Sequence, residues 1–207
     1  VPASELLALA FAEPSEFVPG TAYEYSNTNT LLLGEVIEAV TGKPWPEAVQ
    51  DRIAGPLGLS SVEYGFADPA LDATGFQITG PGTNDELPDV APEWFGAAGG
   101  LTGNIHDLAA WGRELGTGTT LTSATQQERL GMLGSTFDDP KSPFYDRYGF
   151  AIGEIDGWIG HTGNGLGFQA LAMHHPEDGR TVAILVNGTG KDPDLPAAVF
   201  KSLRELF

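Results

Sequence analysis

The sequence contains no cysteine among its 207 residues. Disulfide bonds, thiolate nucleophiles and cysteine-ligated zinc sites are therefore excluded, whereas the cellular compartment stays open. Basic residues are also scarce, because ten lysines and arginines stand against 28 aspartates and glutamates, which gives a formal net charge of −18. Such a charge repels phosphate backbones and anionic membrane surfaces, so nucleic acid is a poor partner.

Long apolar runs are missing as well. No stretch approaches the roughly 20 apolar residues that span a bilayer, so we expect no membrane span in this chain. Residues 1–5 show no basic segment followed by an apolar one, and any export signal would have been removed or would lie upstream. The hydrophobic content of 41% is nevertheless enough to fill a globular core.

Helical spacing of apolar residues dominates the first part of the chain. It predicts helices over 3–12, 28–41, 46–53, 104–115 and 123–133, and a turn over 55–59. Asn27 or Thr28 could cap the second helix, which Gly42 and Pro44 would end. From about 65 to 100 the chain is rich in Gly, Pro, Asp and Thr, which is typical of a long surface loop.

After residue 147 the pattern changes to short segments rich in aromatic and branched residues. We expect strands over 148–155, 158–161, 168–174 and 181–186, hairpin turns at 156–157 and 177–179, and a last helix that Asp192 and Pro193 begin. This order predicts an α+β fold, an antiparallel sheet flanked by helices plus a helical subdomain. We place the mainly helical part with its surface loop at 1–145, and the strands with the C-terminal helix at 146–207.

Two tripeptides stand out, one before the helix at 28–41 and one at a strand end: Tyr25-Ser26-Asn27 and His161-Thr162-Gly163. Each is weak alone, but in this order they resemble the serine β-lactamase-like and penicillin-binding-protein superfamily. The resemblance is to its D-alanyl-D-alanine carboxypeptidase, class C β-lactamase and esterase branches. Residues 19–20, 33–34, 41–42, 56–59 and 99–101 extend it along nearly the whole chain. It implies a β-lactamase/transpeptidase-like fold that is incomplete at the N-terminus.

The resemblance also implies roles for individual residues. Tyr25 would accept or relay the proton of a serine nucleophile, and a neighbouring lysine ammonium would lower the pKa of its phenol. Asn27 would hydrogen-bond that lysine and the substrate amide. His161, where β-lactamases usually carry lysine, would tune the local field and favours peptidase or esterase activity.

Four further positions would bind the substrate. Thr162 would meet a substrate carboxylate, and Gly163 continues the same motif. The backbone N–H of Asn164 would be one of two oxyanion donors. Trp94 would form an aromatic wall of the acyl pocket, in line with its place before a Gly- and Ala-rich segment.

Each of these residues also has a purely structural interpretation. Tyr25 could only pack its ring, Asn27 could only cap a helix, His161 could be a satisfied strand histidine, and Trp94 could belong to the core. We expect no metal and no cofactor. The adjacent His174 and His175 would point to opposite faces of a strand, and the aspartates at 138–139, 192 and 194 lack the spacing of calcium sites and indicate turns and caps.

The nucleophile motif of this superfamily, Ser-x-x-Lys, is absent from the sequence. The chain has four lysines, and the residues three positions before them are Val40, Asp138, Gly188 and Ala198. We therefore expect a serine hydrolase that acts through an acyl-enzyme on an amide or ester, such as a D-alanyl peptide, a β-lactam or a small ester. Its nucleophile would come from an N-terminal segment that is separate or missing, and this chain alone would be inactive.

The same N-terminal segment would pair with an otherwise open edge of the sheet. The alternative is a truncated, non-catalytic binding module of the same fold. The family resemblance implies a secreted, periplasmic or cell-envelope location, and the cytoplasm stays open.

Overall fold

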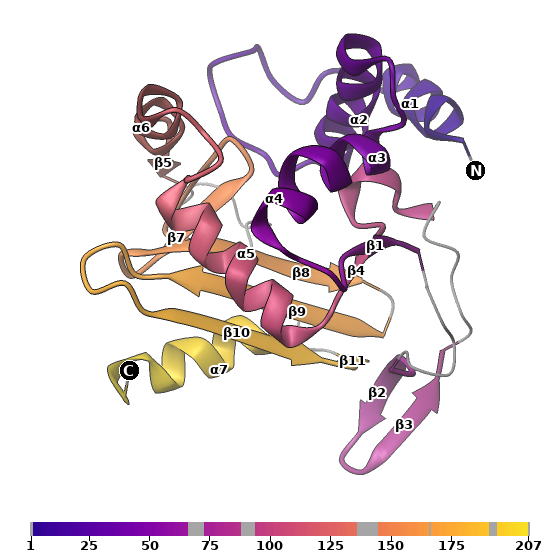
Figure 1. Ribbon diagram of the computed structural model, residues 1–207. Coiled ribbons are helices and arrows are strands. Elements are labelled where there is room, and N and C mark those ends of the chain that lie inside the picture. Colours follow the sequence, from indigo (N-terminus) through magenta and orange to yellow (C-terminus); the bar gives the residue numbers. More distant parts are fainter. Residues whose placement is uncertain are drawn as a thin grey trace. The chain divides into compact units, whose positions relative to one another are not determined.

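The computed structural model describes residues 2–65, 73–87, 94–135, 145–165, 167–190 and 194–206 (Figure 1). The chain divides into two compact units. The helical unit consists of residues 1–72 and 90–103, and the sheet unit consists of residues 73–89 and 104–207. This division differs from the boundary expected at residue 145, because the helices between 105 and 131 belong with the sheet.

The helical unit begins with two helices, α1 (Ala3–Ala12) and α2 (Asn27–Thr41), which confirms the expected helices over 3–12 and 28–41. Ser26 occupies the N-cap position of α2, so the expected cap at Asn27 or Thr28 is wrong. Gly42 ends α2 with a φ of 68°, and its N–H donates to the carbonyl of Glu38 over 2.9 Å.

The next helical segment is longer than expected. It consists of α3 (Trp45–Val49), a π-helical stretch η1 (Gln50–Ala54) and α4 (Gly55–Leu57), so the turn begins at Gly58 instead of Gly55. Small residues allow close packing around α2. A Cβ atom on Gly34 would lie 2.9 Å from the Cβ of Ala97 in the short helix η3 (Gly96–Ala98). Strands β1 (Glu63–Tyr64) and β4 (Leu101–Thr102) pair in the same unit.

Among the described residues of the sheet unit, the main sheet has six antiparallel strands in the order β10-β9-β8-β7-β6-β5. Their bounds are Gly134–Ser135 (β5), Arg147–Gly149 (β6), Ile152–Ile155 (β7), Trp158–Gly165 (β8), Phe168–His174 (β9) and Thr181–Val186 (β10). The expected antiparallel α+β architecture is confirmed. The expected strand over 148–155 is interrupted by a turn at Phe150 and Ala151, both with positive φ, and β8 continues to Gly165.

Helices α5 (Ile105–Thr117) and α7 (Leu195–Leu203) pack against opposite faces of this sheet (Figure 1). Alternate residues of β9 explain the arrangement. Ala172 faces α5, where a Cβ on Gly112 would lie 3.0 Å from it, whereas Leu171 and Met173 join Phe200 of α7 in a fully buried cluster. The remaining described helices of the unit are α6 (Ser123–Gly131) and η4 (Arg204–Leu206).

Side chains cap the N-terminal ends of α5 and α7. Asn104 accepts hydrogen bonds from the backbone N–H groups of residues 106 and 107, both at 3.0 Å, as expected for the start of α5. The N-cap of α7 is Asp194, whose carboxylate accepts the N–H of Ala197 over 3.2 Å. The residue expected to begin this helix, Asp192, lies outside the described residues.

A small second sheet forms inside the segment expected to be a surface loop. It joins β2 (Phe76–Gly80) and β3 (Thr83–Glu86) in an antiparallel hairpin, and β11 (Gly188–Thr189) pairs with β2 in parallel. The described part of this loop thus includes strands that composition did not indicate. Across the described residues, no helix has the length and apolar character needed to cross a membrane.

Candidate active site

The second half of β8, which pairs with β9 but not with β7, carries the His161-Thr162-Gly163 motif. β7 pairs with residues 158–160 of β8, whereas β9 pairs with residues 159–165. Beyond Gly160, the described strands therefore flank β8 on the β9 side alone. The backbone N–H of Thr162 points away from β9 and donates to the phenol oxygen of Tyr145 over 2.6 Å.

Asn164 shares this orientation. Backbone groups two residues apart in a strand point to the same side, so the N–H of Asn164 is directed to the same edge as that of Thr162. This is the geometry that an oxyanion donor requires, because the N–H has to face the substrate and not the neighbouring strand. The sequence-based role of Asn164 remains a prediction, as does that of Gly163 between the two residues.

Thr162 lies beside two buried polar side chains. Its hydroxyl oxygen lies 3.1 Å from the phenol oxygen of Tyr145, where either oxygen can be the donor, and its hydroxyl favours the ionised form of the Asp194 carboxyl. Tyr145 is 4% exposed and Asp194 is 5% exposed. Burial raises the pKa of Asp194, while the hydrogen bonds from Ala197 and Thr162 oppose this shift.

His161 lies on the other face of β8, between two tyrosines. The centre of its ring is 5.6 Å from the ring centres of both Tyr145 and Tyr148. Its Nδ1 contacts the carbonyl oxygen of Thr162, and because a carbonyl only accepts, we place the ring proton on Nδ1. Nε2 then accepts from the Tyr148 hydroxyl over 2.8 Å.

The charge state of His161 follows from its surroundings. Burial lowers its pKa, the carbonyl contact raises it, and the nearby positive charge of Arg129 lowers it further, so that the net shift is downward. The imidazole is therefore held in the neutral form. Here the motif presents a hydrogen-bonding ring in place of a fixed positive charge.

The Tyr25-Ser26-Asn27 motif lies in the helical unit, directly before α2. Ser26 is extended, with φ −143° and ψ 121°, and Asn27 opens the helix. The Asn27 side chain is exposed, and Ser26, not Asn27, holds the N-cap position, so the interpretation of Asn27 as a mere helix cap is wrong.

Tyr25 is half-buried, and burial raises the pKa of its phenol. The lowered pKa expected beside a lysine ammonium is therefore not found in this chain. The reason is that its sequence contains no Ser-x-x-Lys lysine to provide the charge. Trp94, in the same unit, is 61% exposed, which excludes the interpretation as a core residue and leaves its ring accessible.

Sequence reasoning missed the partners of the His-Thr-Gly motif, which are Tyr145, Tyr148, Arg129 and Asp194. The two tyrosines lie 17 and 13 residues before the side chains that they contact, on a different strand and the loop before it. Local periodicity in the sequence cannot predict a contact between residues so far apart. Asp194 carried a signal as a capping residue, but its electrostatic coupling to Thr162 depends on how α7 packs on the sheet.

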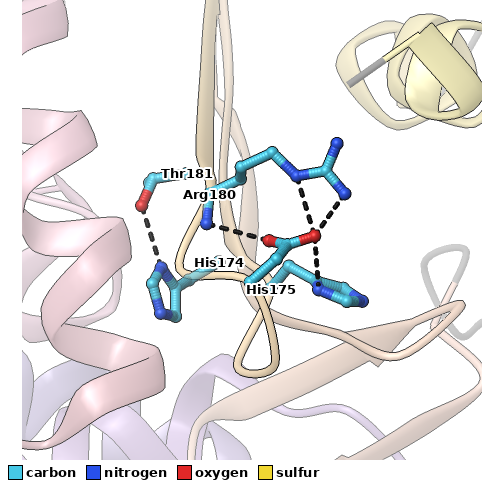
Figure 2. A network of polar contacts seen from close by, with 5 residues as sticks. His174, His175, Arg180 and Thr181 are labelled. Carbon is cyan, nitrogen blue, oxygen red and sulfur yellow. Dashed lines mark hydrogen bonds and ion pairs between the residues drawn. The ribbon is translucent and has the colours of Figure 1, made fainter.

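The two adjacent histidines at the end of β9 have separate partners (Figure 2). His174 Nδ1 lies 2.9 Å from the hydroxyl of Thr181, and His175 Nδ1 lies 3.1 Å from the carboxylate of Asp178, which also binds Arg180. Within the described ranges, no three His, Asp or Glu side chains are grouped as a metal site requires. The aspartates at 138 and 139 lie outside the described residues.

The sheet unit also contains an open cavity of about 420 Å³ near the start of α7. Its walls include Ile78, Pro81 and Leu195, together with Gln169, whose side-chain oxygen accepts the N–H of Leu195 over 2.9 Å. Gln169 is the β9 partner of Asn164.

Comparison with known proteins assigns this geometry to a family. The model of the family called Beta-lactamase matches residues 2–202. A D-aminopeptidase from Brucella anthropi is 26% identical over 200 residues, which are 92% of this chain and 36% of that protein. A D-aminopeptidase from Cereibacter sphaeroides is 26% identical over 188 residues, which are 86% of this chain and 34% of that protein.

Solved structures share the fold. A D-stereospecific amidohydrolase from a Streptomyces species has a TM-score of 0.71 and 28% identity, and the match covers 91% of this chain and 57% of that one. A D-amino acid amidase from Ochrobactrum anthropi SV3, complexed with D-phenylalanine, has a TM-score of 0.80 and 21% identity. This match covers 100% of this chain and 68% of that one. The chain thus spans about a third of the curated relatives and somewhat more than half of these structures.

Proposed function

Since the chain belongs to the Beta-lactamase family, we propose that it is the substrate-binding part of a serine hydrolase acting on D-aminoacyl amides or peptides through an acyl-enzyme. The names of its relatives support the amide class over the ester and carboxypeptidase classes suggested by the motifs alone. The nucleophile would lie on a Ser-x-x-Lys segment outside residues 1–207.

The observation that carries this proposal is the edge of β8 at residues 161–165. A carbonyl placed against this edge would meet the N–H of Asn164, which would stabilise the negative charge that develops on its oxygen. The neutral ring of His161 adds no positive charge to the site. An uncharged amide therefore meets no electrostatic penalty there.

The proposed reaction has two steps. The serine oxygen forms a bond to the amide carbon, the carbon–nitrogen bond breaks, and the serine proton passes to the leaving amine through the Tyr25 phenol. Water then cleaves the resulting ester and restores the serine. Burial alone keeps the Tyr25 phenol protonated, so the phenol would depend on the lysine of the absent segment to become a proton acceptor.

The test uses a protein that contains residues 1–207 together with its Ser-x-x-Lys segment. We expect release of ammonia from D-phenylalanine amide, and a fall in kcat/KM on the order of 10²-fold or more in Tyr25→Phe, because a general base or its relay is lost. Tyr23→Phe, in the same loop, is the matched control and should stay near wild type.

Two results would count against the proposal. Undiminished turnover in Tyr25→Phe would remove the assigned role of the phenol. Reversible binding of D-phenylalanine amide without any turnover would favour the non-catalytic binding module, an alternative supported by the absence of Ser-x-x-Lys from residues 1–207.

A further inference from the structure

We infer that Tyr145 is a positioning residue for the oxyanion site, because its phenol oxygen replaces a missing neighbouring strand beside Thr162 and keeps β8 extended as far as Asn164. This inference rests on the proposed function and adds a residue to its site. It concerns the sheet unit alone, to which all the residues involved belong.

The argument begins where β7 ends. β7 pairs with β8 up to Gly153 and Gly160, and the same antiparallel register would place Ala151 opposite Thr162. The chain turns at this point instead, because Phe150 and Ala151 have φ values of 39° and 53°, outside the range of a strand. β7 therefore offers no main-chain acceptor to Thr162.

A side chain takes over the role of that acceptor. The phenol oxygen of Tyr145 lies 2.6 Å from the backbone nitrogen of Thr162. A backbone N–H can only donate, so the phenol oxygen accepts this bond whichever of the two hydroxyl groups donates to the other. A β7 that continued in register would also pair with Asn164, whereas the phenol ends beside Thr162. β8 is thus supported at Thr162 without a strand that extends to Asn164.

The position of the phenol is determined by packing. Tyr145 is 4% exposed and belongs to the buried cluster that includes Ile155 and Phe200. Its ring lies against Gly153 of β7, where a Cβ atom would be 2.4 Å from two ring carbons. Glycine at this position leaves room for the ring, so Tyr145 can reach past the end of β7 to Thr162.

This support matters for the reaction because Asn164 follows Thr162 on the same edge of β8. An oxyanion donor is most effective when its N–H already has the right direction before charge develops on the substrate oxygen. Without the phenol oxygen, the N–H of the half-buried Thr162 would lose its acceptor, and the strand end would move to satisfy it. Such a movement would redirect the N–H of Asn164. The loss would fall on the transition state and much less on substrate binding.

The experiment uses the protein that contains residues 1–207 together with its Ser-x-x-Lys segment. Tyr145→Phe keeps the ring in the buried cluster and removes only the phenol oxygen. Phe200→Leu is the matched control, because it disturbs the same cluster and leaves that oxygen in place. Turnover of D-phenylalanine amide is measured well below each melting temperature. Affinities are measured for the product D-phenylalanine and for its boronic acid analogue, which adds to the serine and mimics the transition state.

We expect Tyr145→Phe to lower kcat and the affinity for the boronic acid about tenfold, while KM and the affinity for D-phenylalanine change by less than about twofold. The amide chemical shifts of Thr162 and Asn164 should move in the same variant. Phe200→Leu should lower the melting temperature but leave kcat and both chemical shifts near wild type.

A purely structural role of Tyr145 predicts a lower melting temperature with an unchanged kcat, and that result would overturn the inference. Equal losses of affinity for the boronic acid and for D-phenylalanine would overturn it too, as would an equal fall of kcat in Phe200→Leu. If Tyr145→Phe does not fold, Gly153→Ala replaces it, since it keeps the phenol and displaces the ring. The same fall in kcat at constant KM is expected there, and an unchanged kcat would contradict the inference.

The two proposals fail in different ways. A wild-type protein that does not turn over D-phenylalanine amide would contradict the hydrolase. The amide of Asn164 would then decide the inference. A chemical shift that moves in Tyr145→Phe but not in Phe200→Leu would support the role of Tyr145, and a shift that stays in place in both would overturn it.

Discussion

Two histidines on the α5 face of the sheet, the half-buried His161 and the buried His174, have pKa values that desolvation lowers. His174 is 3% exposed, and its ring packs so closely against α5 that a Cβ on Gly116 would lie 2.4 Å from it. Its surroundings include Arg113, which opposes protonation, and Asp178, which favours it. Burial is the largest cause, so both rings are held neutral by the fold itself.

The lowered pKa of His174 predicts a loss of stability in acid. The folded pKa lies below the unfolded value of 6.5, so the unfolded chain binds more protons as pH falls through 6.5. The stabilising effect of the neutral ring is complete above that pH and decreases below it. We expect the melting temperature to fall from pH 7 to pH 5, and to fall less steeply in His174→Gln, measured by circular dichroism.

His106→Gln, which changes an exposed histidine near the start of the same helix α5, is the control and should keep the wild-type slope. If His174→Gln shows the same acid sensitivity as wild type, burial of His174 is not a cause of that sensitivity.

At the scale of elements, the sequence predicted most of the helices and strands whose apolar residues recur with a clear period. The apolar faces of α1, α2 and α5 and the aromatic and branched segments of β9 and β10 were found with nearly their final bounds. The His-Thr-Gly motif was expected at the end of a strand over 158–161, and it does lie on that strand. Its strand extends to Gly165, however, because pairing with β9 holds the glycine-rich end in an extended conformation.

Other elements depend on tertiary contacts and could not be predicted. In the hairpin of β2 and β3, β3 consists of polar residues alone, β2 alternates apolar and polar residues over only four positions, and the partner strand β11 is about 110 residues away in sequence. The π-helical turn of η1 follows no local pattern that differs from an α-helix. Likewise, Tyr145 reaches Thr162 only when β6, β7 and β8 are paired.

The pairing of β8 with β9 requires glycine at position 160. A Cβ there would lie 1.9 Å from the carbonyl oxygen of Ala172, closer than two non-bonded heavy atoms can approach. We expect Gly160→Ala to lower the free energy of unfolding by at least about 2 kcal/mol in a urea titration, since the strands would have to separate.

Gly131→Ala is the matched control. No atom lies within 4 Å of a Cβ on Gly131, which is the last residue of α6, and alanine should gain up to about 1 kcal/mol there. Equal effects of the two substitutions would show that the close approach of β8 and β9 does not constrain position 160.

At the scale of the whole molecule, the proposed function separates the residues that bind the substrate from the serine that attacks it. Residues 1–207 contain the Tyr-Ser-Asn and His-Thr-Gly motifs of a serine hydrolase, but none of the four lysines follows a serine by three positions. The curated relatives are about three times as long as the matched region. The account therefore places the nucleophile outside these residues.

The most direct test of this central claim is an intact-mass measurement after treatment with a fluorophosphonate, which phosphonylates activated serines. A protein that includes the Ser-x-x-Lys segment should gain one phosphonyl group, located on that serine. Residues 1–207 alone should gain no phosphonyl group, even when a cooperative unfolding transition shows that they are folded. A stoichiometric adduct on residues 1–207 alone would contradict the account, because the chain would then contain a nucleophile of its own.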